Sequence, residues 1–360
     1  MRKNTYVAIM AGGIGSRFWP MSRTGYPKQF LDILNSGRTL IQSTFDRFAQ
    51  FVPVENIFVV TSRQYEHIVA EQLPDIKREN ILCEPSRKNT APCVAYICYK
   101  LFQRDPDSNL ICAPADHIVS DKTAFTKVSL EALDFTAKHN ALLTLGVKPT
   151  GPNTGYGYIQ YEGPSVSDNI YKVKTFTEKP DLELAKTFIA SGDFLWNAGI
   201  FVWQTKTIIQ AFEKYLPEIH ELFYAEKDDL NNDNERAATE RIYPLCVNIS
   251  IDYGIIEKAD NVYVLPSSFG WSDLGTWGSA YENLEKDYLD NAVAGNNVMI
   301  FDASKNMVHV DHNKLVLIQG LEDFIVVDTK DALLICKKEN EQEIKQYLTE
   351  VKRNKGEVFL

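Results

Sequence analysis

A glycine-rich segment near the N-terminus has the residue types of a phosphate-binding loop. It directly follows an apolar run at residues 6–10, and Lys28 lies a short distance further on. Glycine allows the backbone to approach a ligand closely, and successive N–H groups can point at phosphate oxygens. A nearby arginine and lysine add charge where a triphosphate would lie. The segment therefore predicts a nucleotide-phosphate site after the first strand, formed by Ala11, Gly12, Gly13, Gly15, Ser16, Arg17 and Lys28. The alternative is an ordinary tight turn between a strand and a helix.

Two better-known glycine loops do not fit this segment. The dinucleotide fingerprint needs a third glycine after Gly13 and Gly15, and Phe18 stands in its place. The P-loop needs a lysine followed by serine or threonine, and no such pair follows the glycines. The sequence therefore predicts a phosphate loop of another kind.

Two aspartates in separate loops could hold one metal ion. Asp116 follows the apolar run 110–112, and Asp273 lies in a loop at 268–277 that is rich in glycine and aromatic residues. Mg²⁺ takes few protein oxygens and otherwise binds water and phosphates, so two carboxylates are enough for a phosphoryl-transfer site. The alternatives are that Asp116 caps the next turn and that Asp273 caps a helix beginning at Leu274.

A second set of polar residues could bind a sugar phosphate. Glu178 and Lys179 end a predicted strand, where the carboxylate could accept sugar hydroxyls and the ammonium could bind a phosphate. The Asn197 amide precedes a buried strand and could bind another hydroxyl. A solvated strand end and turn chemistry are the alternatives. Close backbone approach to a sugar ring, or relief of crowding in a strand, is expected at Gly155 and Gly157, and Tyr156 between them is a predicted sugar-phosphate-binding residue.

Residues 84–92 lie between a predicted strand and a predicted helix. Asn89 or Thr90 could cap that helix, and the helix N-terminus could face a nucleotide. Glu84 could accept hydrogen bonds from the N1 and N2 donors of guanine. Asp252 begins another helix, where a cap and a ligand are equally open interpretations.

The first half of the chain alternates strands and helices. This order indicates right-handed crossovers and a mainly parallel sheet, with ligands at the carboxyl ends of the strands. The expected strands are at 6–10, 57–61, 110–113 and 141–147, and the expected helices at 40–51, 64–73, 91–103 and 122–139.

The rest of the chain shows two other patterns. A hairpin is expected from strands at 155–161 and 171–178 with a turn at 163–168, then helices at 182–190 and 207–224. After residue 291, short β-rich runs recur at 297–301, 307–310, 315–319, 324–327 and 332–336, before a charged helix at 339–355. These runs suit a small all-β unit, so we expect domains at 1–288 and 289–360.

Composition limits the partners. The 360 residues are 44% hydrophobic and 24% charged, and the net charge of −10 argues against a nucleic-acid binder but not against one cationic nucleotide pocket. No signal peptide or run of membrane-spanning length is apparent, so we expect a cytoplasmic protein with no membrane partner. The six cysteines form no C-x-x-C pair, which predicts free thiols and no zinc site.

In this order the motifs resemble those of the sugar-1-phosphate nucleotidylyltransferases, over most of the chain. Segments 27–30 and 196–199 lean toward the members that use mannose rather than glucose. The resemblance implies an α/β fold, with a Rossmann-like nucleotidyltransferase domain on a mixed, mainly parallel sheet and a small C-terminal β domain similar to a left-handed β-helix. The segments that carry it are 11–20 with 27–30, 84–92, 116–117, 155–159, 176–180, 196–201, 252–254 and 270–273.

The resemblance also implies a reaction. A phosphate oxygen of mannose-1-phosphate would attack the α-phosphorus of GTP, giving GDP-mannose and pyrophosphate. Arg17 and Lys28 would be the catalytic cations, and Asp116 and Asp273 would hold Mg²⁺. The β-rich C-terminal unit itself makes a homodimer the expected assembly. Isomerase activity is not expected, because the longer relatives carry it on a further cupin-type domain for which this sequence shows no histidine cluster. Alternatives are glucose-1-phosphate with UTP, dTTP or ATP, and a non-catalytic nucleotide-sugar sensor. The missing third glycine disfavours a nicotinamide oxidoreductase.

Overall fold

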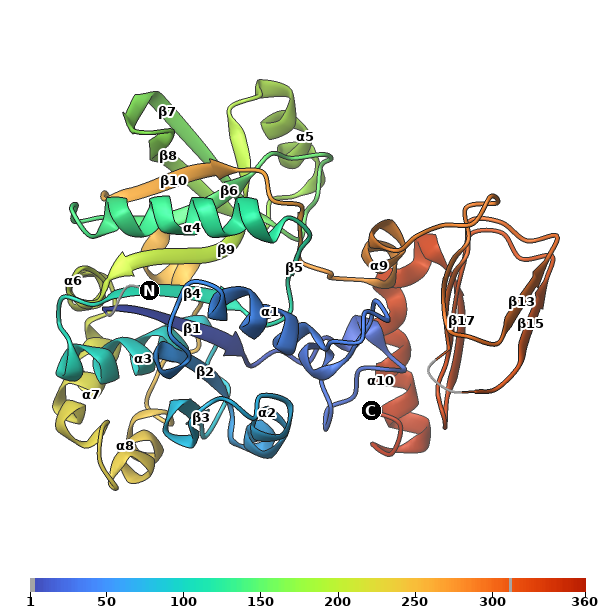
Figure 1. Cartoon of the computed structure of the whole chain (residues 1–360), viewed down its shortest axis with the longest axis horizontal. Helices are drawn as coiled ribbons and strands as arrows, with labels where there is room; N and C mark the ends of the chain where they lie inside the picture. The colour runs from blue at the N-terminus through green and yellow to red at the C-terminus, as the bar shows by residue number, and fades with distance from the viewer. Residues whose placement is uncertain (1–3, 311–312) are drawn as a thin grey trace. The chain divides into compact units, whose positions relative to one another are not determined.

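The computed structural model describes residues 4–310 and 313–360 (Figure 1). These residues form two compact units. Unit 1 contains the residues up to Gly12, then Phe45–Pro114 and Val119–Trp271. Unit 2 contains Gly13–Thr44, Ala115–Ile118 and Ser272–Leu360. The chain therefore leaves unit 1 at the start of the glycine-rich segment and returns to it within helix α1 (Leu40–Ala49).

Unit 1 is built on a nine-stranded sheet with the order β3-β2-β1-β4-β9-β6-β10-β8-β7. Strands β1 to β4, β6, β7 and β10 run in one direction, and β8 and β9 run in the other. The expected mixed, mainly parallel sheet is confirmed. Its strands are β1 (Thr5–Ala11), β2 (Ile57–Ser62), β3 (Ile81–Glu84), β4 (Asn109–Pro114), β6 (Leu142–Val147), β7 (Gly157–Ser167), β8 (Ile170–Glu178), β9 (Phe194–Gln204) and β10 (Val262–Ser267).

The helices of unit 1 pack on this sheet because their apolar faces match its buried strands. In α3, Val94, Ile97 and Cys98 are fully buried in the same core as Phe58 and Leu110 of the sheet. Strands covered on both faces read as continuous apolar runs, which is why β1 could be predicted. The helices are α2 (Glu66–Gln72), α3 (Thr90–Arg104), α4 (Lys122–Thr136), α5 (Leu182–Ser191), α6 (Thr205–Tyr215), α7 (Pro217–Ala225), α8 (Glu235–Ile242) and a π-helical turn (Asp252–Ile256).

Two sequence predictions in unit 1 are wrong in detail. The turn expected at 163–168 is mostly strand, since β7 continues to Ser167 and the reversal falls at Asp168 and Asn169, both with positive φ. The single helix expected at 207–224 is two helices, because Pro217 begins α7 and cannot continue α6.

The C-terminal part of unit 2 is a small parallel β-helix-like structure. Strands β12, β14 and β16 pair in parallel to form one sheet, and β17 pairs with β16 in an antiparallel direction at its edge. Strands β13 and β15 pair in parallel to form a second sheet. The expected recurrence of short strands is confirmed. They are β12 (Ala292–Ala294), β13 (Val298–Phe301), β14 (Met307–Val310), β15 (Val316–Gln319), β16 (Phe324–Asp328) and β17 (Leu333–Lys337).

Helices connect this β structure to the glycine-rich segment inside unit 2. Helix α9 (Trp277–Asn283) and helix α10 (Ile344–Lys355) share a buried core with Phe18, Met307 and Ile325. The charged helix expected at 339–355 is α10 preceded by a 3₁₀ segment (Lys338–Glu343). Short 3₁₀ turns at Ser16–Phe18 (η1) and Lys28–Phe30 (η2) shape the glycine-rich segment itself.

Two further expectations can be compared with the described residues. All six cysteines are free thiols, as predicted. Within residues 4–310 and 313–360, no helix has both the length and the apolar character needed to cross a membrane.

Candidate active site

The glycine-rich loop of unit 2 is held by its carbonyl groups. The Gly13 carbonyl accepts from Gln29 Nε2 at 3.1 Å, and the Ile14 carbonyl accepts from Ser22 Oγ at 2.6 Å. The Gly15 carbonyl accepts from the Phe18 N–H at 3.0 Å. Within the described chain, the N–H groups of Gly13, Ile14 and Gly15 donate to no protein acceptor. A loop with fixed carbonyls and available N–H groups is a suitable cradle for phosphate oxygens.

Gly15 cannot be replaced by a larger residue without disturbing Lys28. Its φ is +68°, in the left-handed region, and a Cβ placed there would lie 2.3 Å from Lys28 Cβ. The loop therefore packs directly on the stem of this lysine. The spacing between the glycines and Lys28 is therefore a packing requirement as well as a chemical one.

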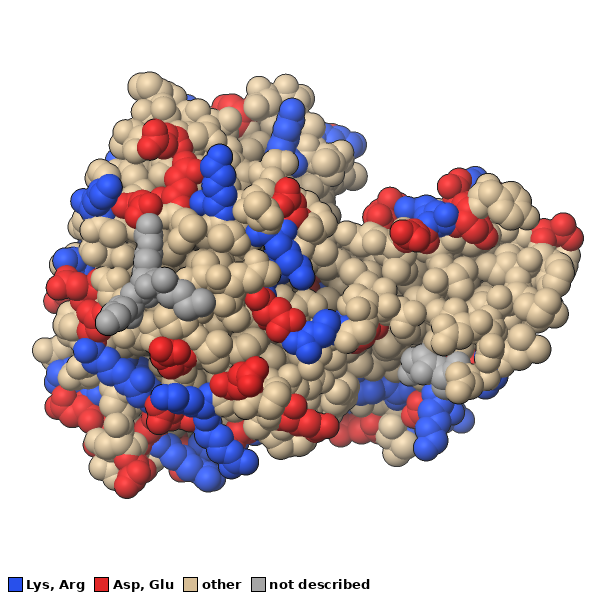
Figure 2. Space-filling model, viewed as in Figure 1, with Lys and Arg blue, Asp and Glu red and all other residues tan. Residues whose placement is uncertain are grey.

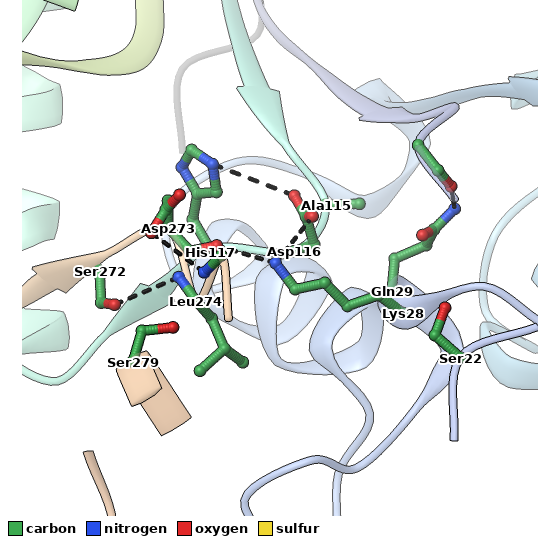
Figure 3. Close-up of polar contacts among 12 residues, drawn as sticks. Ser22, Lys28, Gln29, Ala115, Asp116, His117, Ser272, Asp273, Leu274 and Ser279 are labelled. Atoms are coloured by element: carbon green, nitrogen blue, oxygen red, sulfur yellow. Dashed lines mark hydrogen bonds and ion pairs between the residues drawn. The ribbon is translucent and has the colours of Figure 1, made fainter. Parts of the chain in front are cut away.

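Lys28 contacts both of the predicted metal-binding aspartates (Figure 3). Its side chain is almost fully buried, and Nζ donates to Asp116 Oδ2 at 3.0 Å and to the Asp273 backbone carbonyl at 2.8 Å. Asp116 follows β4, whereas Asp273 follows the short strand β11 (Trp271–Ser272). One ammonium group thus holds two loops that are 157 residues apart in the chain.

Charge keeps the Asp116 carboxyl ionised. Burial acts to raise its pKa, but the charges of Lys28 and His117, with the hydrogen bond from Lys28, outweigh burial and hold the pKa below its ordinary value. His117 Nε2 lies 4.0 Å from Asp116 Oδ1. An ionised carboxylate with a protein cation on one oxygen can still offer oxygen ligands to a divalent ion.

The suggested helix-capping role of Asp273 is wrong. Helix α9 begins at Trp277, and Thr276 caps it in a capping box with Ser279. Asp273 Oδ1 instead accepts from the Gly275 N–H at 3.1 Å, so the carboxylate shapes its own loop. Asp116 accepts from Lys28 Nζ, and the alternative role as a turn cap stays open beside this contact.

The residues at 84–92 form a separate group in unit 1. Glu84 ends the edge strand β3 and is 5% exposed, with one oxygen accepting from Tyr243 OH at 3.1 Å. Its other oxygen would lie 3.6 Å from a Cβ on Gly12, so the two predicted nucleotide residues are neighbours. Burial raises the pKa of Glu84 to about 8, against the opposing effects of Tyr243 and Arg87. Both the protonated and the ionised form of Glu84 are therefore populated near neutral pH.

Asn89 and Thr90 take different roles at the start of α3. Asn89 is the N-cap, with φ of +66°, and its Oδ1 accepts from the Thr90 N–H at 2.9 Å. Thr90 Oγ1 accepts from the Ile251 N–H at 2.9 Å. Of the two residues expected to cap this helix, Asn89 does so, and Thr90 ties the helix to the segment that carries Asp252. Ala11 is buried at the end of β1 and its carbonyl accepts from Thr61 Oγ1.

The predicted sugar-reading residues meet at the carboxyl end of β8. Glu178 contacts the Lys179 ammonium, and its side chain is 10% exposed. A Cβ on Gly157 would lie 2.4 Å from Glu178 Oε2 and 3.3 Å from Asn197 Cβ. Gly157 therefore makes room for Glu178 and Asn197 to approach each other, which favours crowding relief over the other interpretation of this glycine.

Asp252 is the functional candidate that sequence reasoning left undecided. Asn197 Nδ2 donates to Asp252 Oδ1 at 3.0 Å, while Asn197 Oδ1 accepts from Thr144 Oγ1 at 2.9 Å. Burial, followed by the charge of Glu178, raises the pKa of Asp252 to about 7. The only available sequence signal was an aspartate at a helix start, which does not reveal a contact with a residue 55 positions away.

The predicted site residues thus fall into three groups. Unit 2 holds Gly13, Gly15, Ser16, Arg17, Lys28, Asp116 and Asp273, and unit 1 holds Ala11, Gly12, Glu84, Asn89 and Thr90 in one group and Tyr156, Gly157, Glu178, Lys179 and Asn197 in another. Tyr156 joins the last group because its carbonyl accepts from the Lys179 N–H. Gly155 stays outside it, since its N–H donates to Asn153 Oδ1.

Comparison with known proteins identifies the class first. A nucleotidyl transferase family model matches residues 6–290, and a model described as a MannoseP isomerase/GMP-like beta-helix domain matches residues 295–351. The chain belongs to the nucleotidyl transferase family and, within it, to the mannose-1-phosphate guanylyltransferase group. It is therefore an enzyme of the nucleotidyltransferase class, with the expected catalytic fold and β-helix-like C-terminal domain.

Three relatives illustrate how much of the chain is similar to known proteins. A mannose-1-phosphate guanylyltransferase of Escherichia coli K12 is 34% identical, over 96% of this chain and 73% of the relative. The alginate biosynthesis protein AlgA of Pseudomonas aeruginosa is 36% identical, over 95% of this chain and 71% of the relative. A crystal structure titled mannose-1-phosphate geranyltransferase, from Thermus thermophilus, matches with a TM-score of 0.86 and 30% identity, over 97% of this chain and 99% of the other.

Proposed function

We propose that the protein transfers GMP from GTP to mannose-1-phosphate, giving GDP-mannose and pyrophosphate. The observation that carries the proposal is the glycine loop with available N–H groups, packed on a lysine that holds Asp116 and Asp273. Loop amides, a buried cation and two carboxylates are the parts that nucleotidyl transfer needs. The name of the Escherichia coli relative, a mannose-1-phosphate guanylyltransferase, supports the guanylyl and mannosyl specificity.

The chemistry requires no covalent enzyme intermediate, because the nucleophile is already an anion. A phosphate oxygen of the sugar bonds to the α-phosphorus of GTP, and the bond from that phosphorus to the bridging oxygen of pyrophosphate breaks. The loop amides and Arg17 would neutralise the departing pyrophosphate, and Lys28 the region of the α-phosphate. The protein acts by positioning and by neutralising charge.

Asp116 and Asp273 fit a magnesium ion by donor chemistry. Both offer hard oxygen ligands, and Lys28 holds their loops together. In the part of the chain that the structure describes, no cluster of three or more His, Cys, Asp or Glu side chains could hold a metal. A site with two carboxylates suits Mg²⁺, which keeps water and phosphate ligands. Bound Mg²⁺ would stabilise negative charge on the phosphates.

Residues of unit 1 would bind and recognise the sugar. Lys179 would hold the sugar phosphate, while Glu178 and Asn197 would bind sugar hydroxyls. Glu84, beside Gly12, would accept from the guanine N1 and N2 donors. This role needs the ionised carboxylate, which the raised pKa of about 8 disfavours at neutral pH. Gly157 would serve this site by giving Glu178 and Asn197 room to approach each other.

A pyrophosphate-release assay tests the function. GTP with Mg²⁺ should release pyrophosphate only when mannose-1-phosphate is present, with GDP-mannose as product. A panel with glucose-1-phosphate and with UTP, dTTP and ATP measures selectivity. Asp116→Ala should lower turnover by at least about tenfold at every Mg²⁺ concentration. Near-normal turnover of Asp116→Ala would show that Asp116 does not hold the metal. If no nucleotide and sugar-phosphate pair releases pyrophosphate, the protein would be a non-catalytic nucleotide-sugar sensor.

We further propose a homodimer that meets on the sheet formed by β13 and β15. Met299 and Leu317, which pair across this sheet, are 47% and 60% exposed, and Phe301 is 46% exposed. Figure 2 shows mainly uncharged side chains over this β-rich part in that view, with charged ones along its edges. Since each chain carries a net charge of −10, two copies can meet most easily on an uncharged apolar face.

The oligomeric state in solution tests this face. Light scattering coupled to gel filtration should give a dimer for the wild type and a monomer for Leu317→Glu. The matched control is Leu245→Glu, at a leucine of unit 1 that is 68% exposed. A dimeric Leu317→Glu would contradict the proposal. The six free thiols and the net charge of −10 support a cytoplasmic enzyme with no nucleic-acid or membrane partner.

A further inference from the structure

Two cations of unit 2, Arg17 and Lys345, have no anionic partner among the residues that the structure describes. Arg17 lies in η1, and its Nε is buried without a hydrogen-bond partner. Lys345 lies in the first turn of α10. Within residues 4–310 and 313–360, neither side chain forms an ion pair or donates a hydrogen bond.

Packing inside unit 2 brings these two side chains together. Leu348 packs in the same core as Phe18 of η1. Leu348, Thr349 and Lys352 line a pocket of about 240 Å³ whose other wall includes Ser16 and Trp19. Trp19 Nε1 donates to the Phe359 carbonyl at 2.7 Å, which fixes the end of the chain against the same segment.

Lys345 projects from this same face of α10. Residues three, four and seven positions apart share one side of a helix, so Lys345 lies in line with Leu348, Thr349 and Lys352. The charge of Arg17, followed by burial, lowers the pKa of Lys345. The two positive groups are therefore near enough to repel each other.

The neighbouring cations show the contrast. Arg23 pairs with Asp331 at 2.8 Å, and Lys352 pairs with Glu357 at 2.6 Å. Both of these residues line the same pocket, yet each has its own carboxylate. Repulsion between two unpaired cations is relieved when an anion binds between them.

We propose that Arg17 and Lys345 together bind the β- and γ-phosphates of GTP and the pyrophosphate product, so that the C-terminal helix contributes a residue to the nucleotide site. The inference rests on the proposed function, which already assigns Arg17 to the departing pyrophosphate. Two cations suit a pyrophosphate group better than a single one, because it carries several negative charges. The loop N–H groups that follow β1 would complete the cradle.

Calorimetric titration of the full chain with GTP, GMP and inorganic pyrophosphate tests the proposal. Lys345→Gln should lower the affinity for GTP and for pyrophosphate by about tenfold, as expected for loss of a charge-assisted contact to phosphate. GMP affinity should not change, because GMP lacks the β- and γ-phosphates. Lys345→Arg should retain most of the affinity for GTP. Lys352→Gln is the matched control, since it removes an ion-paired lysine from the same helix face.

The outcomes separate this inference from the proposed function. Wild-type affinity for GTP and pyrophosphate in Lys345→Gln overturns the inference, and so does an equal loss for GMP. A loss of GTP affinity in Lys352→Gln as large as that in Lys345→Gln also overturns it. If the wild type forms no GDP-mannose but Lys345→Gln selectively loses affinity for pyrophosphate, the phosphate site is supported and the proposed reaction is not.

Discussion

Gly157→Ala should damage sugar recognition more than it damages folding. A Cβ on Gly157 would lie 2.4 Å from Glu178 Oε2, where an ordinary contact is 3.4 Å or more. Glu178 must therefore move by about 1 Å, and a displacement of that size can lower the rate of a positioned reaction by about a hundredfold. Phe176 and Asn197 would also be crowded, at 3.2 and 3.3 Å. Overpacking of this kind costs about 1–3 kcal/mol of stability.

The assay is pyrophosphate release as mannose-1-phosphate is varied at saturating GTP. We expect kcat/KM for the sugar to fall by about ten- to a hundredfold, with GTP binding nearly unchanged. Gly151→Ala is the matched control, because a Cβ there meets no atom within 4 Å. In the Gly157→Ala background, shortening the acid by Glu178→Asp should recover part of the lost stability. Normal sugar kinetics in Gly157→Ala would refute the assignment of Glu178 to the sugar.

Two predictions concern stability and pH, measured by urea unfolding from pH 4 to 8. Burial, with Glu178, raises the pKa of Asp252 from 3.8 to about 7, so the folded state holds more protons in that range and stability falls as pH rises. Asp252→Asn should remove up to about 4 kcal/mol of this fall, and an unchanged slope would contradict the burial argument. Burial lowers the pKa of His309 from 6.5 to about 4, so its contribution to stability is lost as pH falls through that range. His309→Leu should flatten the acid side of the curve by up to about 3 kcal/mol, whereas a variant as acid-sensitive as the wild type would show that His309 is not responsible.

The sequence predicted elements and local loops better than contacts between them. The strand before the glycines and the turn at Gly15 follow from apolar continuity and from glycine chemistry. The meeting of Asp116 with Asp273 on Lys28 was expected only as shared metal binding, and the lysine that joins them was assigned to phosphate alone. Such contacts depend on how β4 and the loop before α9 are folded together, which no local pattern records. The break at Pro217 had a clear local signal that helical periodicity obscured.

Backbone strain marks the same loops independently of their side-chain chemistry. Most non-glycine residues with positive φ in the described chain are asparagine or aspartate, which tolerate this region. Lys179, Leu274 and Lys305 do not belong to those types, yet their φ values are +50°, +45° and +57°. Lys179 and Leu274 each follow a carboxylate assigned to substrate or metal, Glu178 or Asp273, whereas Lys305 lies in the turn between β13 and β14. Strain of this kind persists only where the surroundings fix the backbone, and here the Lys179 N–H bonds to the Tyr156 carbonyl while Leu274 is fully buried. The two carboxylates are thus held by conformations that their own sequences disfavour, which supports a role in precise positioning.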